Sequence, residues 1–188
     1  MIRHLLSPVA LLLWTVPAFF AGESPTTTRP APCSGPGWQQ MDFWIGEWDL
    51  TWPARNQNPA GTGTNRIEKI LGGCVVEERF AANGPAPLIG RSVSTYDPQS
   101  RKWRQTWVDN QGSYLDLEGG LDGERMILSR KGTSRQGKPQ MSRMVFLNIT
   151  SDSFDWRWEK SEDGGKSWQL MWPIHYGRRK NVTPPPAR

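Results

Sequence analysis

The chain has 188 residues, eleven of them tryptophan and two cysteine, and its formal net charge is +5. The positive excess lies entirely near the two ends, in Arg3, Arg178, Arg179, Lys180 and Arg188, so that residues 4–177 carry no net charge. A basic tip of this kind is usually a solvated terminus and does not predict nucleic-acid binding. Two cysteines without a neighbouring histidine pair also argue against a zinc site, and no metal is predicted.

Residues 1–22 have the pattern of a secretory signal peptide. Arg3 precedes an apolar run from Leu5 to Phe20, and small residues follow at the point where a signal peptidase could cut. The run is shorter than the roughly 20 residues that a membrane-spanning helix needs, and a single membrane anchor is the alternative. We therefore expect a periplasmic or secreted protein without stable membrane insertion.

The rest of the chain is predicted to hold one folded domain between two flexible flanks. Residues 23–36 are rich in proline and threonine, and residues 181–188 form a tail with three consecutive prolines. Residues 37–180 are enough for one domain with a core and too few for two. In an oxidising compartment Cys33 and Cys74 are expected to form a disulfide, which would stabilise the fold by roughly 3 to 4 kcal/mol in the loop-entropy model.

Ten short β-strands are predicted within this domain. Alternating runs recur between turn-forming residues at 47–52, 64–71, 74–80, 89–96, 102–108, 113–118, 125–130, 141–149, 154–160 and 167–176. The turns are short, so strands that are adjacent in the sequence should be antiparallel neighbours. An up-and-down barrel removes both sheet edges, and we predict this all-β fold, with a two-sheet sandwich as the alternative. Residues 39–46 lack strict alternation and are expected to form a short helical turn that plugs one end.

The alternation also predicts which side chains share a face of each strand. Three runs place aromatic side chains together: Phe154, Trp156 and Trp158 in one, Trp103, Gln105 and Trp107 in another, and Trp168, Leu170, Trp172, Ile174 and Tyr176 in the last. We expect these faces to point inward, where each large apolar side chain contributes roughly 1.5 to 3 kcal/mol when buried.

The first strand begins with the pattern Gly46-x-Trp48. This pattern resembles the G-x-W signature of lipocalin-like (calycin) barrels, which include fatty-acid-binding proteins and the haem-binding nitrobindins. In those families the tryptophan packs across the closed end of the barrel, and an arginine from the last strand lies against it. Arg178 has the same parity as Trp172 and Tyr176, so the resemblance implies a cation-π contact between Arg178 and Trp48 and hydrogen bonds from Arg178 to the plug.

Four longer segments extend the resemblance. The stretches CSGPGWQQMDFWIGEWDLTW, NRIEKILGGCVVEERF, YDPQSRKWRQTWVDNQGSYLDLEG and SEDGGKSW occur in this order. Together they resemble an uncharacterised family of secreted bacterial calycin-like domains, over almost the whole chain that follows the predicted signal peptide, from Cys33 to about Lys180. The resemblance implies a barrel, a pairing of Cys33 with Cys74, and a cavity for a small molecule.

Residues 161–168, SEDGGKSW, fit the pattern S-x-D-x-G-x-x-W of the Asp-box in bacterial sialidases. The motif occurs once, in a domain too short for a six-bladed propeller, so a structural role is expected. Asp163 can accept backbone hydrogen bonds, Gly164 and Gly165 permit positive φ, and Trp168 can cover the turn. We interpret the motif as the hairpin that leads into the last strand.

Binding of a small apolar or planar molecule inside the barrel is the predicted function. The candidate cavity residues are Trp52, Arg91, Trp103, Gln105, Trp107, Trp156, Trp158 and Trp172. In a binding cavity the aromatic faces would supply the apolar walls, and Gln105 and Arg91 would supply the polar contacts. The alternative is that these indoles simply fill the barrel as a core.

Two further functions are weighed. A haem-binding protein similar to the nitrobindins would need an interior histidine, but His175 alternates with the inward-facing Trp172 and Ile174 face and is expected outside. An enzyme or a surface interaction module on the same barrel is the other alternative. No G-x-S-x-G, H-E-x-x-H or P-loop pattern is present, and the carboxylates, including Glu77 and Glu78, follow no catalytic spacing. No catalytic residue and no cofactor are therefore predicted.

Overall fold

The computed structural model describes residues 31–55, 59–134 and 136–180. The predicted signal peptide at 1–22, the first part of the predicted flexible segment and the predicted tail at 181–188 lie outside the described residues. No helix in the described part of the chain is long and apolar enough to cross a membrane.

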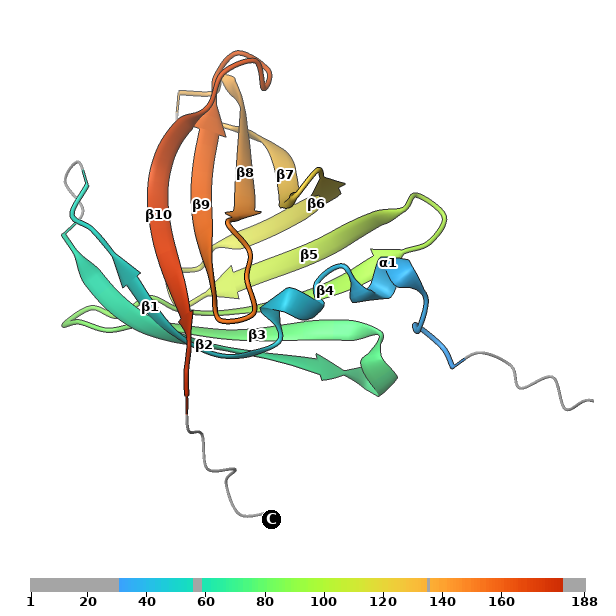
Figure 1. Cartoon of the computed structure of the whole chain (residues 1–188). Helices are drawn as coiled ribbons and strands as arrows, with labels where there is room; N and C mark the ends of the chain where they lie inside the picture. The colour runs from blue at the N-terminus through green and yellow to red at the C-terminus, as the bar shows by residue number, and fades with distance from the viewer. Residues whose placement is uncertain (1–30, 56–58, 135, 181–188) are drawn as a thin grey trace, which may run out of the picture.

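Ten antiparallel strands form a closed barrel (Figure 1). They are β1 (Gly46–Trp52), β2 (Gly61–Ile70), β3 (Val75–Ala82), β4 (Ile89–Asp97), β5 (Lys102–Asp109), β6 (Tyr114–Asp122), β7 (Arg125–Thr133), β8 (Pro139–Leu147), β9 (Ser153–Ser161) and β10 (Gln169–Arg178). Each strand pairs with its sequence neighbours, and β1 pairs with β10 to close the sheet. The predicted up-and-down barrel is confirmed, and the sandwich alternative is wrong.

A short helical segment covers one end of the barrel, as predicted. It consists of α1 (Pro36–Gln39) and the 3-10 turn η1 (Asp42–Trp44). Two side chains of this segment, Met41 and Trp44, are buried. The predicted disulfide between Cys33 and Cys74 is present and ties this segment to the chain just before β3, after the 3-10 turn η2 (Leu71–Gly73).

Gly46, Trp48 and Arg178 meet at the plugged end. The Arg178 guanidinium carbon lies 4.2 Å from the centre of the Trp48 ring, and Nη1 donates a hydrogen bond of 2.9 Å to the Ile45 carbonyl. The Trp48 Nε1–H donates to the Trp44 carbonyl at 2.8 Å. Gly46 has φ of +135°, and a Cβ there would collide with the Arg178 side chain. The glycine is therefore required both by its backbone conformation and by this close approach.

A β-bulge in β10 overturns part of the predicted face pattern. Leu170 pairs with Glu159 while Trp172 pairs with Trp158, so one extra residue lies between the two pairs. The side chains of β10 that precede the bulge therefore point to the opposite face from the one that strict alternation with Trp172 predicts. Trp168 lies on the outside, with its ring 3.9 Å from the guanidinium carbon of Arg143. The prediction that Trp168 and Leu170 share the inward face of Trp172 is wrong.

The turn between β9 and β10 is built around Asp163. Its Oδ1 accepts backbone hydrogen bonds of 3.0 Å from Lys166 and Ser167 and one of 2.7 Å from the Ser161 hydroxyl. The Ser167 hydroxyl donates to Oδ2 at 2.6 Å. This bond first of all, together with the bonds to Oδ1, holds the pKa of the Asp163 carboxyl well below its usual value. Gly165 has φ of +91°, and its carbonyl accepts a bond from the indole of Trp168. The Asp-box thus folds as a hairpin turn.

Candidate functional site: an interior cavity

The barrel encloses a cavity of about 340 Å³. Trp44 of the plug lines it at one end, and Leu88, Asp109 and Gln140 line it near the strand ends away from the plug. The space between is bounded by aliphatic, polar and aromatic side chains, and the aromatic ones are Phe80, Trp107, Trp156, Trp158, Trp172 and Tyr176. The strand periodicity places these side chains inside, because inward positions recur at every second residue.

The indoles present flat faces and edges at right angles to one another. Trp156 and Trp158, two residues apart on β9, have nearly parallel rings with an interplanar angle of 10° and centroids 6.3 Å apart. The Trp172 ring stands at 87° to that of Trp156, with centroids 5.9 Å apart. Such a wall offers both ring faces and ring edges to an apolar or planar molecule.

Glu78 places a carboxylate in this aromatic surrounding. It lies on β3 between the buried side chains of Val76 and Phe80 and is itself 6% exposed. Its Oε1 accepts a hydrogen bond of 2.7 Å from the amide of Asn65, and its Oε2 accepts one of 2.6 Å from the Ser92 hydroxyl. Burial raises the pKa of Glu78 to about 6, because desolvation disfavours the charged form. At neutral pH most of the Glu78 carboxyl groups are ionised.

Two cationic side chains line the cavity on other strands. Arg130 of β7 is paired in register with Ser142 of β8, and Ser142 is paired with Lys160 of β9. All three side chains line the cavity. The interior therefore combines aromatic walls with charged groups of both signs.

Four buried side-chain atoms lack a hydrogen-bond partner within the described ranges. They are Trp44 Nε1, Asn65 Oδ1, Gln105 Oε1 and Arg130 Nε. Trp44 and Arg130 line the cavity. Buried polar groups usually have partners, so these two donors stand out among the polar groups of the cavity lining.

The structure places the predicted cavity residues in four groups. Trp107, Trp156, Trp158 and Trp172 line the cavity. Trp52 lies behind this wall, with its ring 5.3 Å from that of Trp172.

Trp103 and Gln105 are buried away from the cavity, contrary to the prediction. The Trp103 indole donates to Gln40 of the segment after α1 at 3.2 Å, and the Gln105 amide donates to the Ser94 hydroxyl at 3.1 Å. Both side chains are buried, and neither lines the cavity.

The prediction that Arg91 contributes to the interior is wrong. Arg91 alternates with the buried Gly90 and Ser92, so its side chain lies on the exposed face of β4.

Sequence reasoning missed Glu78, Arg130 and Lys160 as cavity residues, although a signal for all three was present: Lys160 has the parity of Trp156 and Trp158 on β9. Glu78 has the parity of Val76 and Phe80, and Arg130 has the parity of Met126 and Leu128. A charged residue on an otherwise apolar face is the signal that could have found them.

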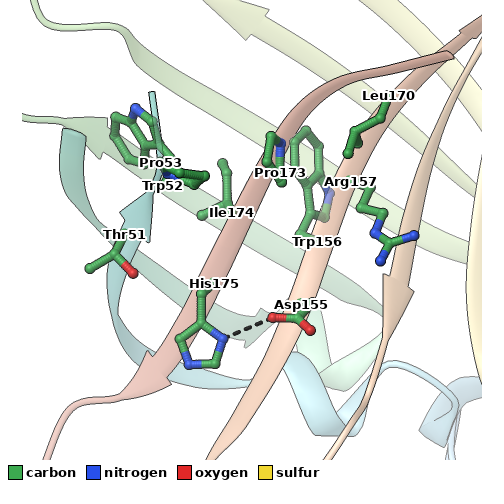
Figure 2. A pocket seen from close by; sticks show the side chains of 10 residues that line it. All are labelled: Thr51, Trp52, Pro53, Asp155, Trp156, Arg157, Leu170, Pro173, Ile174 and His175. Carbon is green, nitrogen blue, oxygen red and sulfur yellow. Dashed lines mark hydrogen bonds and ion pairs between the residues drawn. The ribbon is translucent and has the colours of Figure 1, made fainter. Parts of the chain in front are cut away.

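A second hollow, of about 530 Å³, lies on the outside between β1 and β10 (Figure 2). Pairing of these strands ends at Thr51 and His175, and the groove opens beyond that point. His175 Nδ1 lies 2.8 Å from Asp155 Oδ1, and the histidine side chain is 57% exposed. His175 thus faces solvent, on the side that strand parity predicts.

These features define a class of protein: a plugged antiparallel barrel with a ligand-sized interior. The family model described as "Protein of unknown function (DUF1579)" matches residues 36–178, from the first residue of α1 to the last residue of β10. The chain belongs to this family. No curated protein matches it.

Proposed function

We propose that the barrel binds a small molecule with an apolar or planar body in its interior cavity. The observation that carries this proposal is the cavity of about 340 Å³ with aromatic walls. Its volume exceeds the roughly 300 Å³ at which ligand pockets begin. A completely filled core, the alternative considered from the sequence, would leave no such space between the indoles.

The proposal also states that the barrel is lipocalin-like and that the protein is exported from the cytoplasm. The contact between Trp48 and Arg178 supports the resemblance to calycin barrels. The apolar run from Leu5 to Phe20 and the disulfide between Cys33 and Cys74 support a periplasmic or secreted location. Haem binding through His175 is not part of the proposal, because that side chain faces solvent.

Filling the cavity tests the proposal. Ser142 is buried on β8 and lines the cavity, whereas the half-buried Ser129 lies at an outward-facing position on β7, between the inward Leu128 and Arg130. The phenyl ring of Ser142→Phe should fill part of the cavity, whereas Ser129→Phe adds the same ring on the outer face of the barrel. Tryptophan fluorescence should be titrated with fatty acids, flavonoids and tetrapyrroles for the unaltered protein and both variants.

We expect saturable, stoichiometric quenching by at least one member of the panel in the unaltered protein and in Ser129→Phe. Ser142→Phe should lose that response while its circular dichroism spectrum stays native. A flat response across the panel, or equal affinity in a folded Ser142→Phe variant, would contradict binding in the cavity.

A further inference from the structure

The charged groups that line the cavity are separated by sign. The carboxylates of Glu78 and Asp109 come from β3 and β5, whereas the cations of Arg130 and Lys160 come from β7 and β9. In the ring of ten strands β3 stands five positions from β8, directly across the barrel. Glu78 and the row formed by Arg130, Ser142 and Lys160 thus come from opposite sides of the ring of strands.

Unpartnered donors lie on the cationic side of the cavity. Arg130 Nε belongs to β7, and Trp44 Nε1 belongs to a ring that packs 5.3 Å from Phe146 of β8. Both residues line the cavity.

These opposite charges do not neutralise one another. Within the described ranges, none of Glu78, Arg130 and Lys160 forms an ion pair. The Glu78 carboxylate has neutral hydrogen-bond donors but no cation beside it, and an opposite charge stabilises an ionised group more strongly than a neutral donor does. A molecule with a positive group at one end and a negative group at the other would supply both partners at once.

We propose that the ligand is zwitterionic, with a protonated amine at Glu78, a carboxylate or similar anion at Arg130 and Lys160, and an apolar middle against the indoles. This inference rests on the proposed function and adds the chemical class of the ligand. Aromatic rings beside the carboxylate, including Phe80 and Trp107, would further favour a cation there.

Matched probes separate this inference from the proposed function. ω-Amino acids on chains of six, eight and eleven carbons should be titrated by calorimetry at pH 7.5, together with the amine, the acid and the alcohol of each chain length. At the best chain length we expect the ω-amino acid to bind about tenfold more tightly than either the amine or the acid, since each lost end group removes a charge-assisted hydrogen bond.

Two variants assign the ends of the ligand. Glu78→Gln should weaken binding of the ω-amino acid and the amine about tenfold and leave the acid and the alcohol unchanged. Arg130→Gln should weaken binding of the ω-amino acid and the acid about tenfold and leave the amine and the alcohol unchanged. Glu77→Gln and Lys131→Gln are matched controls, because both residues are sequence neighbours on the outward face of the same strands. They should bind all probes like the unaltered protein.

The possible outcomes are distinct. If the alcohol binds as tightly as the ω-amino acid, or if Glu78→Gln and Arg130→Gln weaken all probes equally, the zwitterion is wrong and apolar binding stands. If no probe in the set binds while the fluorescence panel does, the ligand class is likewise wrong. Failure of both experiments would overturn the proposed function as well.

Discussion

The Glu78 carboxylate accepts hydrogen bonds from Asn65 and Ser92 inside a largely aromatic cavity. Two hydrogen bonds offset only part of the desolvation, so the pKa remains raised from 4.5 to about 6. At the residue scale, this side chain is the clearest departure from what a purely structural barrel would need, because an apolar residue would fill the same position without the cost of desolvation.

The raised pKa of Glu78 predicts how stability depends on pH. The folded state binds the Glu78 proton more tightly than the unfolded state, so this contribution to stability is fully present below pH 4.5 and is lost as the pH rises through about 6. The loss corresponds to about 2 kcal/mol. Urea unfolding at pH 4 and pH 7 should show Glu78→Gln gaining about that much relative to the unaltered protein at the higher pH.

The outward-facing Glu77→Gln is the control for this measurement, because Glu77 is paired with Arg79 on the outer face. It should show no comparable gain between the two pH values. A free-energy difference between Glu78→Gln and the unaltered protein that stays constant with pH would contradict the burial of an ionisable group in the cavity.

At the scale of the element, the hairpin between β9 and β10 shows how a motif can indicate structure rather than chemistry. Asp163 makes all its hydrogen bonds within the turn, to Ser161, Lys166 and Ser167. Trp168 closes the turn from the outside and stacks on Arg143, away from the cavity. The match to the sialidase Asp-box therefore describes a way of joining two strands.

Asp163→Ala should lower the thermal midpoint without changing the affinity for any cavity ligand, because the lost hydrogen bonds hold only the turn. Differential scanning calorimetry and the fluorescence titration, carried out on the same samples, check both parts. Lys166→Ala is a suitable control, since only the backbone of Lys166 bonds to Asp163. A large loss of binding in an Asp163→Ala protein with an unchanged midpoint would show that the motif takes part in function.

Strand periodicity predicted most of the fold but could not locate its irregularities. The ten runs and their antiparallel order follow from alternation and short turns, and the same parity places Trp156, Trp158 and Trp172 inside. The bulge after Leu170 has no local signal, because one extra residue leaves the composition of the strand unchanged and only reverses the side of what precedes it. The outward position of Trp168 could therefore not be predicted.

The candidate site was harder to predict than the fold, because its charged groups come from strands distant in the sequence. The parity of Glu78 was visible on β3, but its opposition to Arg130 depends on barrel closure between β1 and β10. Likewise, alternation predicted an inward Trp103 but not that the plug would cover it through Gln40. Closure of the barrel and covering of its end depend on contacts between segments distant in the sequence, so neither can be predicted from a single run of residues.

At the scale of the whole molecule, closure and the plug together account for the cavity. Pairing of β1 with β10 is reinforced where Arg178 lies over Trp48 and bonds to the Ile45 carbonyl of the plug segment. Trp44 then closes the same end, and the space above it is left to the indoles of β5, β9 and β10. The barrel is thus packed and hydrogen-bonded at one end and hollow toward the other, an arrangement compatible with the proposed ligand pocket.

The most direct test of interior binding is to record the indole Nε1–H resonances of ¹⁵N-labelled protein while adding the best probe from the fluorescence panel. We predict saturable shifts for Trp107, Trp156, Trp158 and Trp172, which line the cavity, and unchanged resonances for the outer Trp168 and for Trp38 beside Tyr96. Shifts confined to Trp168 or Trp38, with the four cavity indoles unmoved at saturation, would contradict it.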